Sequence, residues 1–232
     1  MAYFLGHPVY LPATLPSYLD LLITFFSHSL LNPHQSAYRR HHSTETSLLY
    51  ILDHFITAIS SQKLSCLCLL DLSVAFDTID HDILLTRLSS WFGIHGSVLN
   101  WFKSYLSSRT FCVKCNDCFS SLHTSLYGVP QGSVLGSLLF IMYTTPLSTL
   151  ISSLSLYHHL YADETQLFLS FRPSDFQTSI SHLQNALTQI TSWLTSNQRR
   201  RAIEAIEARP HKTVWRLWLT VYRTELKVSL CA

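Results

Sequence analysis

Two apolar runs that contain acidic residues decide the fold of this 232-residue chain: residues 64–71, LSCLCLLD, and residues 156–171, LYHHLYADETQLFLSF. A short apolar run that ends in an acid is typical of a buried strand that delivers a carboxylate to the edge of a sheet. The second run is interrupted by Asp163 and Glu164, which predicts two strands around a tight turn with these acids at its tip. Asp71, Asp163 and Glu164 are therefore the first candidates for chemistry.

Helical patterns surround these strands. A helix is expected to start after Ser43, with Thr46 completing an imperfect capping box, and to run to about Ser60. Its apolar residues recur along one face: Leu48, Leu49, Leu52, Phe55, Ile56 and Ile59. Further segments are expected as helices at about 81–92, 97–107, from 136 to at least 143, and 175–196, and as a hairpin-like region at 110–127. The pattern predicts an α+β fold.

The composition is that of a chain that can bury a substantial core. Hydrophobic residues make up 47% of the sequence and charged residues only 13%, and the formal net charge is +2. The basic residues are unevenly spread, because residues 199–232 hold 8 of the 16 lysines and arginines but only 3 of the 14 acids. The body of the chain has no basic excess, which argues mildly against tight nucleic-acid binding by the body alone.

The six cysteines indicate a reducing compartment. Cys66 and Cys68 lie in an apolar run and are expected as buried thiols. Cys112, Cys115 and Cys118 have the C-x2-C-x2-C spacing of some iron–sulfur ligands. A strand there would point successive cysteines in different directions, so a metal cluster is not expected.

No segment predicts a membrane span or a signal peptide. The longest apolar stretch, residues 134–151, is interrupted by Pro146 and by hydroxyl residues, and it is shorter than the 20 or so residues that cross a bilayer. We expect no membrane partner.

Acids at strand ends have two interpretations. Burying an unpaired carboxylate is costly, so such acids need a partner, and a pair of Mg²⁺ ions that serve phosphoryl transfer is one candidate. The alternative is that Asp71, Asp163 and Glu164 only form turns or surface salt bridges. Their spacing alone leaves both interpretations open.

Five segments, in order, resemble the conserved motifs of reverse transcriptases from non-LTR (LINE) retrotransposons, with the nearest likeness in the L2/CR1-like branch. They are QSAYRRHHSTETSLL (35–49), LDLSVAFDTIDH (70–81), GVPQGSVLG (128–136), YADE (161–164) and LQNALTQITSWLTSN (183–197). The resemblance covers about residues 30–198.

This resemblance implies a polymerase palm, an antiparallel sheet with packed helices, together with partial fingers and no thumb. We expect an N-terminal apolar fingers remnant at 1–32, the fingers and palm at 33–198, and an unrelated basic tail at 199–232. The implied activity is RNA-directed DNA polymerisation by two-metal nucleotidyl transfer to a primer 3′-OH. The implied cofactor is a pair of Mg²⁺ ions, with Mn²⁺ as a substitute. The implied partners are an RNA template, a DNA primer and deoxynucleoside triphosphates, in the nucleus or the cytoplasm, and the oligomeric state stays open.

The resemblance also assigns roles residue by residue. The catalytic and metal-binding residues are Asp71, Asp163 and Glu164. The nucleotide-binding residues are Arg39, Arg40, Phe76, Gln131 and Gly132. The template- or primer-binding residues are Tyr161 and Gly128. Alternatives remain: Phe76 can be ordinary core packing, the glycines can serve only turns, and the arginines can be solvated surface residues.

Two departures from the family pattern bear directly on the chemistry. Glu164 stands where the motif normally has a second aspartate. Residues 199–201, three arginines, stand where the family has an Asn-Pro-x-Lys-Thr segment with a lysine that acts as a general acid. We therefore expect a truncated and partly degenerate domain. The alternative function is a catalytically inactive fragment with at most non-specific RNA binding through residues 199–232.

Overall fold

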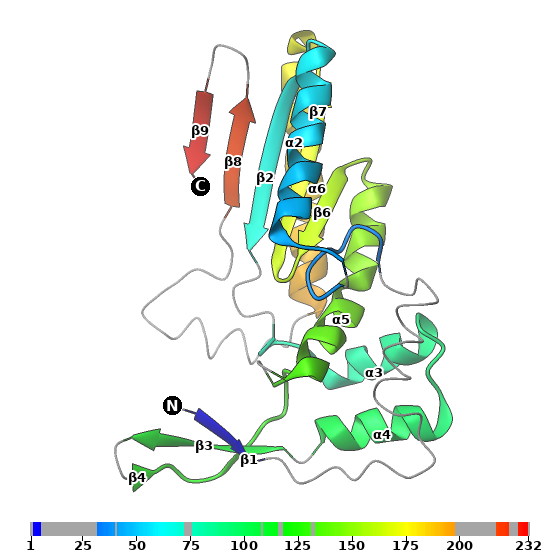
Figure 1. The fold of residues 1–232 in the computed structure, drawn as a ribbon, viewed down its shortest axis with the longest axis vertical. Helices are drawn as coiled ribbons and strands as arrows, with labels where there is room; N and C mark the ends of the chain where they lie inside the picture. Colours follow the sequence, from blue (N-terminus) through cyan, green and yellow to red (C-terminus); the bar gives the residue numbers. More distant parts are fainter. Residues whose placement is uncertain are drawn as a thin grey trace. The chain divides into compact units, whose positions relative to one another are not determined.

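The computed structural model of the chain describes residues 2–5, 32–39, 41–71, 76–107, 109–115, 118–130, 133–197, 217–222 and 227–231 (Figure 1). Helices and antiparallel strands alternate along them, which confirms a mixed helix and sheet fold. The chain divides into two compact units. One unit comprises residues 1–31, 76–143 and 197–202, and the other comprises residues 32–75, 144–196 and 203–232.

The second unit is built on a five-stranded sheet of order β6-β7-β2-β8-β9, in which every neighbouring pair is antiparallel. Its strands are β2 (Leu64–Asp71), β6 (Tyr157–Tyr161), β7 (Glu164–Phe171), β8 (Leu217–Tyr222) and β9 (Lys227–Cys231). Its other elements are α2 (Thr44–Ser60), the short 3-10 helix η1 (Pro173–Asp175) and nearly all of α6 (Phe176–Asn197). β2 and the β6–β7 pair are the strands that the two acid-bearing runs predicted.

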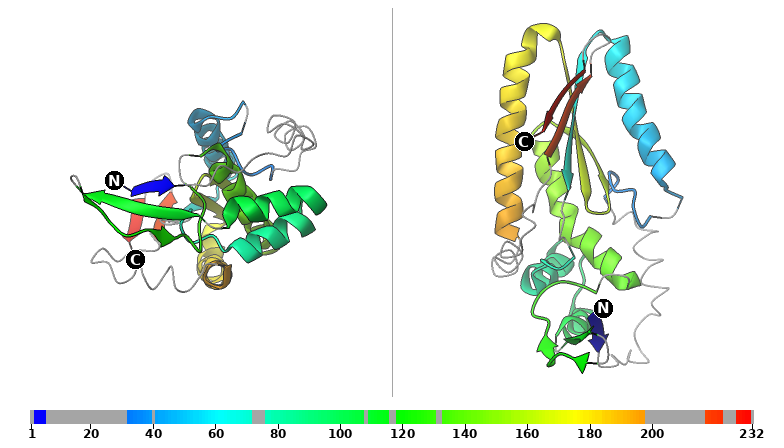
Figure 2. Two further views of the ribbon diagram at one scale, coloured as in Figure 1. Left: turned by 90° about the horizontal axis from the view of Figure 1, so that it is seen from below. Right: turned by 90° about the vertical axis from the view of Figure 1, so that its left-hand side faces the viewer.

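Helices α2 and α6 cover opposite faces of this sheet (Figure 2, right). Side chains of β2 that alternate in direction are consequently buried on both sides, among them Ser65, Cys66 and Cys68. The predicted buried thiols are confirmed: burial raises the pKa of the Cys66 thiol to about 11 and that of Cys68 to about 12. From α6, Leu183, Ala186, Ile190 and Leu194 are buried.

Helix α2 starts with the predicted capping box, in which Ser43 and Thr46 each accept a hydrogen bond from the other's backbone N–H. The face that packs inward differs from the apolar face read from the sequence. Its buried residues are Ser47, Ile51 and Ala58. The residues of the predicted apolar face are mostly exposed, by 51–64%: Leu48, Leu49, Leu52, Ile56 and Ile59. The small side chains of Ser47 and Ala58 let the helix approach the sheet. A pattern based on hydrophobicity alone does not identify such a face.

The first unit contains two helices, a small sheet and the start of α5 (Val134–Ser153). The helices are α3 (His81–Ser90) and α4 (Gly96–Leu106). The strands are β1 (Ala2–Leu5), β3 (Thr110–Cys115), β4 (Cys118–Phe119) and β5 (His123–Thr124), with β3 pairing with each of the others. The fully buried residues of its core include Ile79, Leu84, Leu88, Phe102 and Phe140.

Helix α5 is long and apolar enough over residues 135–153 to cross a membrane by length and composition. In this protein 61% of that stretch is buried inside the fold. Leu139 and Ile151 are completely buried, and the helix continues through Pro146.

The C-terminal residues contribute strands to the second unit. β8 pairs with β2 from Ser65 to Leu70, and β9 extends the sheet beyond β8. The predicted domain boundary at residue 198 stays a prediction.

Candidate active site at the end of β2 and β7

The candidate acids meet at one end of the five-stranded sheet. Antiparallel pairing places Asp71, the last residue of β2, in register with Glu164, the first residue of β7. Glu164 is also paired with Tyr161, the last residue of β6. Three strands therefore bring Asp71, Tyr161 and Glu164 to the same end of the sheet. Asp163 directly precedes Glu164 in the chain.

The turn between β6 and β7 consists of Ala162 and Asp163, so Glu164 starts the strand rather than lying at the tip. Ala162 has φ of +53°, in the left-handed region. That conformation costs a non-glycine residue roughly 1–2 kcal/mol. Asp163 is half-buried and Glu164 is exposed. The backbone at this tip thus holds a strained conformation beside the candidate carboxylates.

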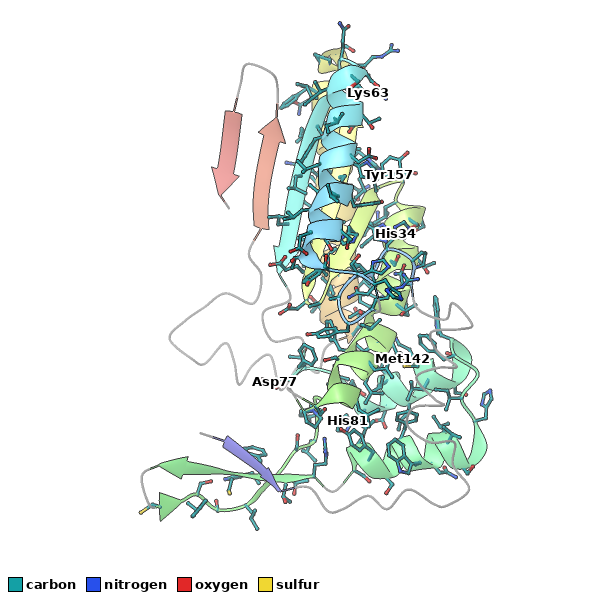
Figure 3. All side chains as sticks on the ribbon, in the orientation of Figure 1. His34, Lys63, Asp77, His81, Met142 and Tyr157 are labelled. Carbon is teal, nitrogen blue, oxygen red and sulfur yellow. The ribbon has the colours of Figure 1, made fainter. Side chains whose placement is uncertain are left out.

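In the other unit, residues 76–81 are joined by hydrogen bonds to the start of the GVPQG segment. The Gly128 N–H donates to Ile79 O and the Val129 N–H donates to Phe76 O, both at 2.8 Å. The His81 Nε2–H donates to Gly128 O, also at 2.8 Å (His81 is labelled in Figure 3). Two segments 47 residues apart in sequence are thereby fixed to each other.

Gly128 is required at this junction. Its φ is +78°, and a Cβ added there would lie 2.8 Å from Phe76 O and 2.9 Å from the Cα of Asp77. Phe76 itself is half-buried and stacks on Phe140, with ring centroids 4.7 Å apart and an interplanar angle of 24°. Asp80 is the N-cap of α3, because its Oδ1 accepts hydrogen bonds from the backbone N–H groups of Asp82 and Ile83.

Arg39 lies in a loop of the second unit that is anchored to β6. Its Nη1 donates to Asn32 O at 3.2 Å. The loop is attached by two backbone hydrogen bonds, from the Ser36 N–H to Leu160 O and from the Leu160 N–H to His34 O. Strand β6, to which this loop is hydrogen-bonded, ends at Tyr161, and Tyr161 is paired with Glu164. Three further predicted site residues, Arg40, Gln131 and Gly132, lie outside the described residues.

Side-chain contacts that the sequence analysis missed reinforce this attachment. The Ser36 hydroxyl lies 2.8 Å from Nε2 of His159 and 3.1 Å from Nδ1 of His42. His158, the neighbouring residue of β6, is buried beside Ser148. Its ring is tilted by 42° against that of His34, with ring centroids 4.4 Å apart (His34 is labelled in Figure 3). Burial, with the nearby imidazole of His34, lowers the pKa of His158 to about 4. No motif signals the contacts of Ser36 with His159 and of His34 with His158, because each joins residues more than 100 positions apart.

Comparison with known proteins decides the family. Residues 17–215 match the model of the family described as reverse transcriptase (RNA-dependent DNA polymerase). The chain belongs to the reverse transcriptase family.

The similar proteins are polymerases of mobile elements. The chain is 32% identical over 118 residues to a probable RNA-directed DNA polymerase from transposon BS of Drosophila melanogaster, covering 51% of this chain and 13% of that protein. It is 34% identical over 116 residues to the corresponding protein of the X-element of the same species, covering 48% of this chain and 12% of the relative. It is 28% identical over 164 residues to the RNA-directed DNA polymerase from the mobile element jockey of D. melanogaster, covering 68% of this chain and 18% of the relative. The chain therefore spans less than a fifth of the length of these relatives.

These comparisons confirm the predicted LINE-type reverse transcriptase domain. Within this reverse transcriptase domain, Asp71, Asp163 and Glu164 supply carboxylate oxygens, the hard ligands that Mg²⁺ prefers. Among the described side chains, which do not include that of Asp71, no group of three or more His, Cys, Asp or Glu residues is arranged to hold a metal. The donor chemistry of the three acids thus fits a divalent cation, and their assignment as ligands stays a prediction.

Proposed function

We propose that this reverse transcriptase domain transfers deoxynucleotides to a primer 3′-OH under the direction of an RNA template. The observation that carries the proposal is the register of Asp71 with Glu164, next to Asp163 in the adjoining turn. Strands from distant parts of the sequence thereby bring three acids to the same end of the sheet.

The proposed cation ligands are Asp71 and Asp163, assisted by Glu164. Bound there, a pair of Mg²⁺ ions, or Mn²⁺ in their place, supplies activation of the primer hydroxyl and neutralisation of charge on the leaving pyrophosphate. The protein's own part is to hold the carboxylates in place, and the paired strands β2 and β7 do so from adjacent backbone positions. Glu164 is one methylene longer than the aspartate usual in the motif, so its carboxylate reaches further into a site whose cation tolerates little distortion.

The substrate-contacting residues are proposed from the motifs they occupy. Arg39 and Arg40 are proposed to bind the triphosphate, since a guanidinium can hold phosphate through two hydrogen bonds. Gln131 and Gly132 are proposed to contact the incoming nucleotide.

Phe76, Gly128 and Tyr161 complete the proposal. Phe76 is proposed to contact the sugar of the nucleotide, and its stacking on Phe140 supports a fixed ring position. Gly128 and Tyr161 are proposed to contact the template or primer. The hydrogen bonds of Gly128 to residues 76–81 support a junction that sets the position of Phe76.

We further propose that residues 33–198 form a polymerase palm with partial fingers. The five-stranded antiparallel sheet flanked by α2 and α6 supports the palm assignment. The segment 35–49, whose loop with Arg39 is anchored to β6, is proposed as part of the partial fingers.

The test is extension of a DNA primer on an RNA template by the purified full chain, in Mg²⁺ and separately in Mn²⁺. The wild-type chain is expected to add deoxynucleotides, and Asp71→Asn is expected to abolish the addition. Asp53→Asn, which removes an exposed acid of α2 by the same chemical change, is the matched control and is expected to retain it. Equal extension by wild type and Asp71→Asn contradicts the site. No extension by folded wild-type chain in either metal supports the inactive-fragment alternative.

A further inference from the structure

Strands β3 and β4 pair with each other (Figure 1), and two cysteines lie in register at the end of β3 and the start of β4. Antiparallel pairing matches Cys115 with Cys118 and Lys114 with Phe119, and only Asn116 and Asp117 separate the two cysteines in sequence. Residues paired in this way have Cα atoms about 4.5 or 5.5 Å apart. Both separations lie within the range of roughly 4.4–6.8 Å that a disulfide bridges. We propose that Cys115 and Cys118 are a reversible redox pair that low-molecular-weight disulfides such as oxidised glutathione close into a disulfide.

The exposure of Cys118 and the raised pKa of the buried thiols favour reaction at Cys118 over the cysteines of β2. Cys118 is an exposed free thiol at the start of β4. Cys66 and Cys68 are buried in β2, and burial raises the pKa of both thiols, so they hold little of the thiolate that attacks a disulfide.

The remaining neighbour, Cys112, is too far from Cys115 to form a disulfide with it. It is buried, and its Cα partner across the sheet is Tyr3. It precedes Cys115 by three residues in the same strand, which sets their Cα atoms about 10 Å apart at roughly 3.3 Å per residue. That distance exceeds the reach of a disulfide.

The reaction balances in two exchange steps. The thiolate of Cys118 attacks one sulfur of oxidised glutathione, forms a mixed disulfide and releases one glutathione thiolate. The thiolate of Cys115 then attacks the Cys118 sulfur of that mixed disulfide and releases the second glutathione. Two protein thiols are oxidised to one disulfide, oxidised glutathione is reduced to two thiols, and the two protons from the cysteines end on the two glutathione molecules.

This disulfide is expected to respond to the surrounding redox conditions and to add little stability to the fold. Stabilisation by a disulfide grows with the length of the loop it closes, and here the loop contains only two intervening residues. Exposed disulfides are also the more easily reduced ones. Closure is therefore expected to be reversible.

The test is thiol mapping of the full chain treated with oxidised glutathione, alkylated without reduction and cleaved with trypsin. Cleavage after Lys114 and Arg199 yields a peptide, residues 115–199, because trypsin does not cut the Arg172–Pro173 bond. The only cysteines of this peptide are Cys115 and Cys118, while Cys112 lies in the separate peptide 110–114. We expect the longer peptide to be lighter by two hydrogen atoms, to resist alkylation, and to take two alkyl groups after reduction. Glutathione adducts on both cysteines, full alkylation, or a link to another peptide or another chain overturns the proposal.

Two comparisons separate the role of the hairpin from that of the C-x-x-C sequence. Closure is expected to be faster in the folded chain than in the chain unfolded by urea, because pairing of β3 with β4 holds the two cysteines in register. An equal or slower rate in the folded chain contradicts the role of the hairpin. Cys118→Ser is expected to prevent closure, whereas Cys112→Ser, the matched control, is expected to leave it unchanged.

Discussion

Asp71, the last residue of β2, is paired in register with Glu164, the first residue of β7. The two residues are 93 positions apart in sequence, and Asp163 adjoins the pair in the turn that β7 follows. This relationship turns three separate acids into one candidate cation site of a reverse transcriptase domain, and it leads to the first prediction.

Restoring the usual aspartate at position 164 is expected to increase nucleotide incorporation. Glu164→Asp shortens the side chain by one methylene, and Mg²⁺ requires near-ideal octahedral geometry, so we expect a gain of roughly tenfold. Glu164→Gln, which keeps the length and removes the charge, is the control and is expected to give no gain. The measurement is the single-nucleotide incorporation rate on a primed RNA template, and a lower rate for Glu164→Asp than for wild type contradicts the proposed geometry.

Gly128→Ala is expected to destabilise the protein strongly. The new Cβ combines a left-handed φ of +78° with a 2.8 Å approach to Phe76 O, so we expect a loss of roughly 2–5 kcal/mol in the free energy of unfolding. Gly93→Ala is the matched control, because Gly93 has φ of +64° but no atom within 4 Å of the added Cβ. It is expected to cost only about 1–2 kcal/mol. Urea denaturation measures both, and equal losses contradict the close approach at Gly128.

Two isoleucines of α2 are expected to differ in their contribution to stability. Ile51 is buried against the sheet, and Ile51→Ala is expected to lower the free energy of unfolding by about 2–5 kcal/mol. Ile56 is 62% exposed, and Ile56→Ala is expected to change it by less than about 0.5 kcal/mol. Chemical denaturation of the two variants measures these changes. A larger loss of unfolding free energy for Ile56→Ala than for Ile51→Ala would support the inward face that the sequence pattern indicated.

Acid is expected to destabilise the fold through His158. Burial holds its folded pKa at about 4, below the usual 6.5, so the unfolded chain takes up the proton first. The contribution of the neutral imidazole to stability is complete above pH 6.5 and is lost as the pH falls towards 4, at a rate of at most about 1.4 kcal/mol per pH unit. His158→Gln is expected to flatten this dependence between pH 6.5 and 4, whatever its constant cost at pH 7.5. An unchanged slope in denaturation measured across that range refutes the assignment.

Much of the local structure follows from the sequence. Ser43 and Thr46 predicted the start of α2, because capping depends on residues close together in the chain. The strand ending at Asp71 and the hairpin around Asp163 were likewise predictable from apolar runs interrupted by acids.

The contacts between distant segments were not predictable in this way. Nothing in the sequence signals that Ser36 lies between His42 and His159, or that Gly128 is bonded to Ile79. The inward face of α2 was missed for a related reason. Hydrophobicity identifies an apolar stripe, but small residues such as Ser47 and Ala58 can form the face that packs against a sheet.

The central claim, that β2 and β7 carry one cation site, is tested most directly by the binding of Mn²⁺ to the purified full chain, followed by the electron paramagnetic resonance of free Mn²⁺. This measurement needs no turnover. We predict that the wild-type chain binds Mn²⁺, that Asp71→Asn and Asp163→Asn each lose this binding, and that Asp53→Asn retains it. Binding by Asp71→Asn equal to that of wild type would show that the acid of β2 takes no part in the site.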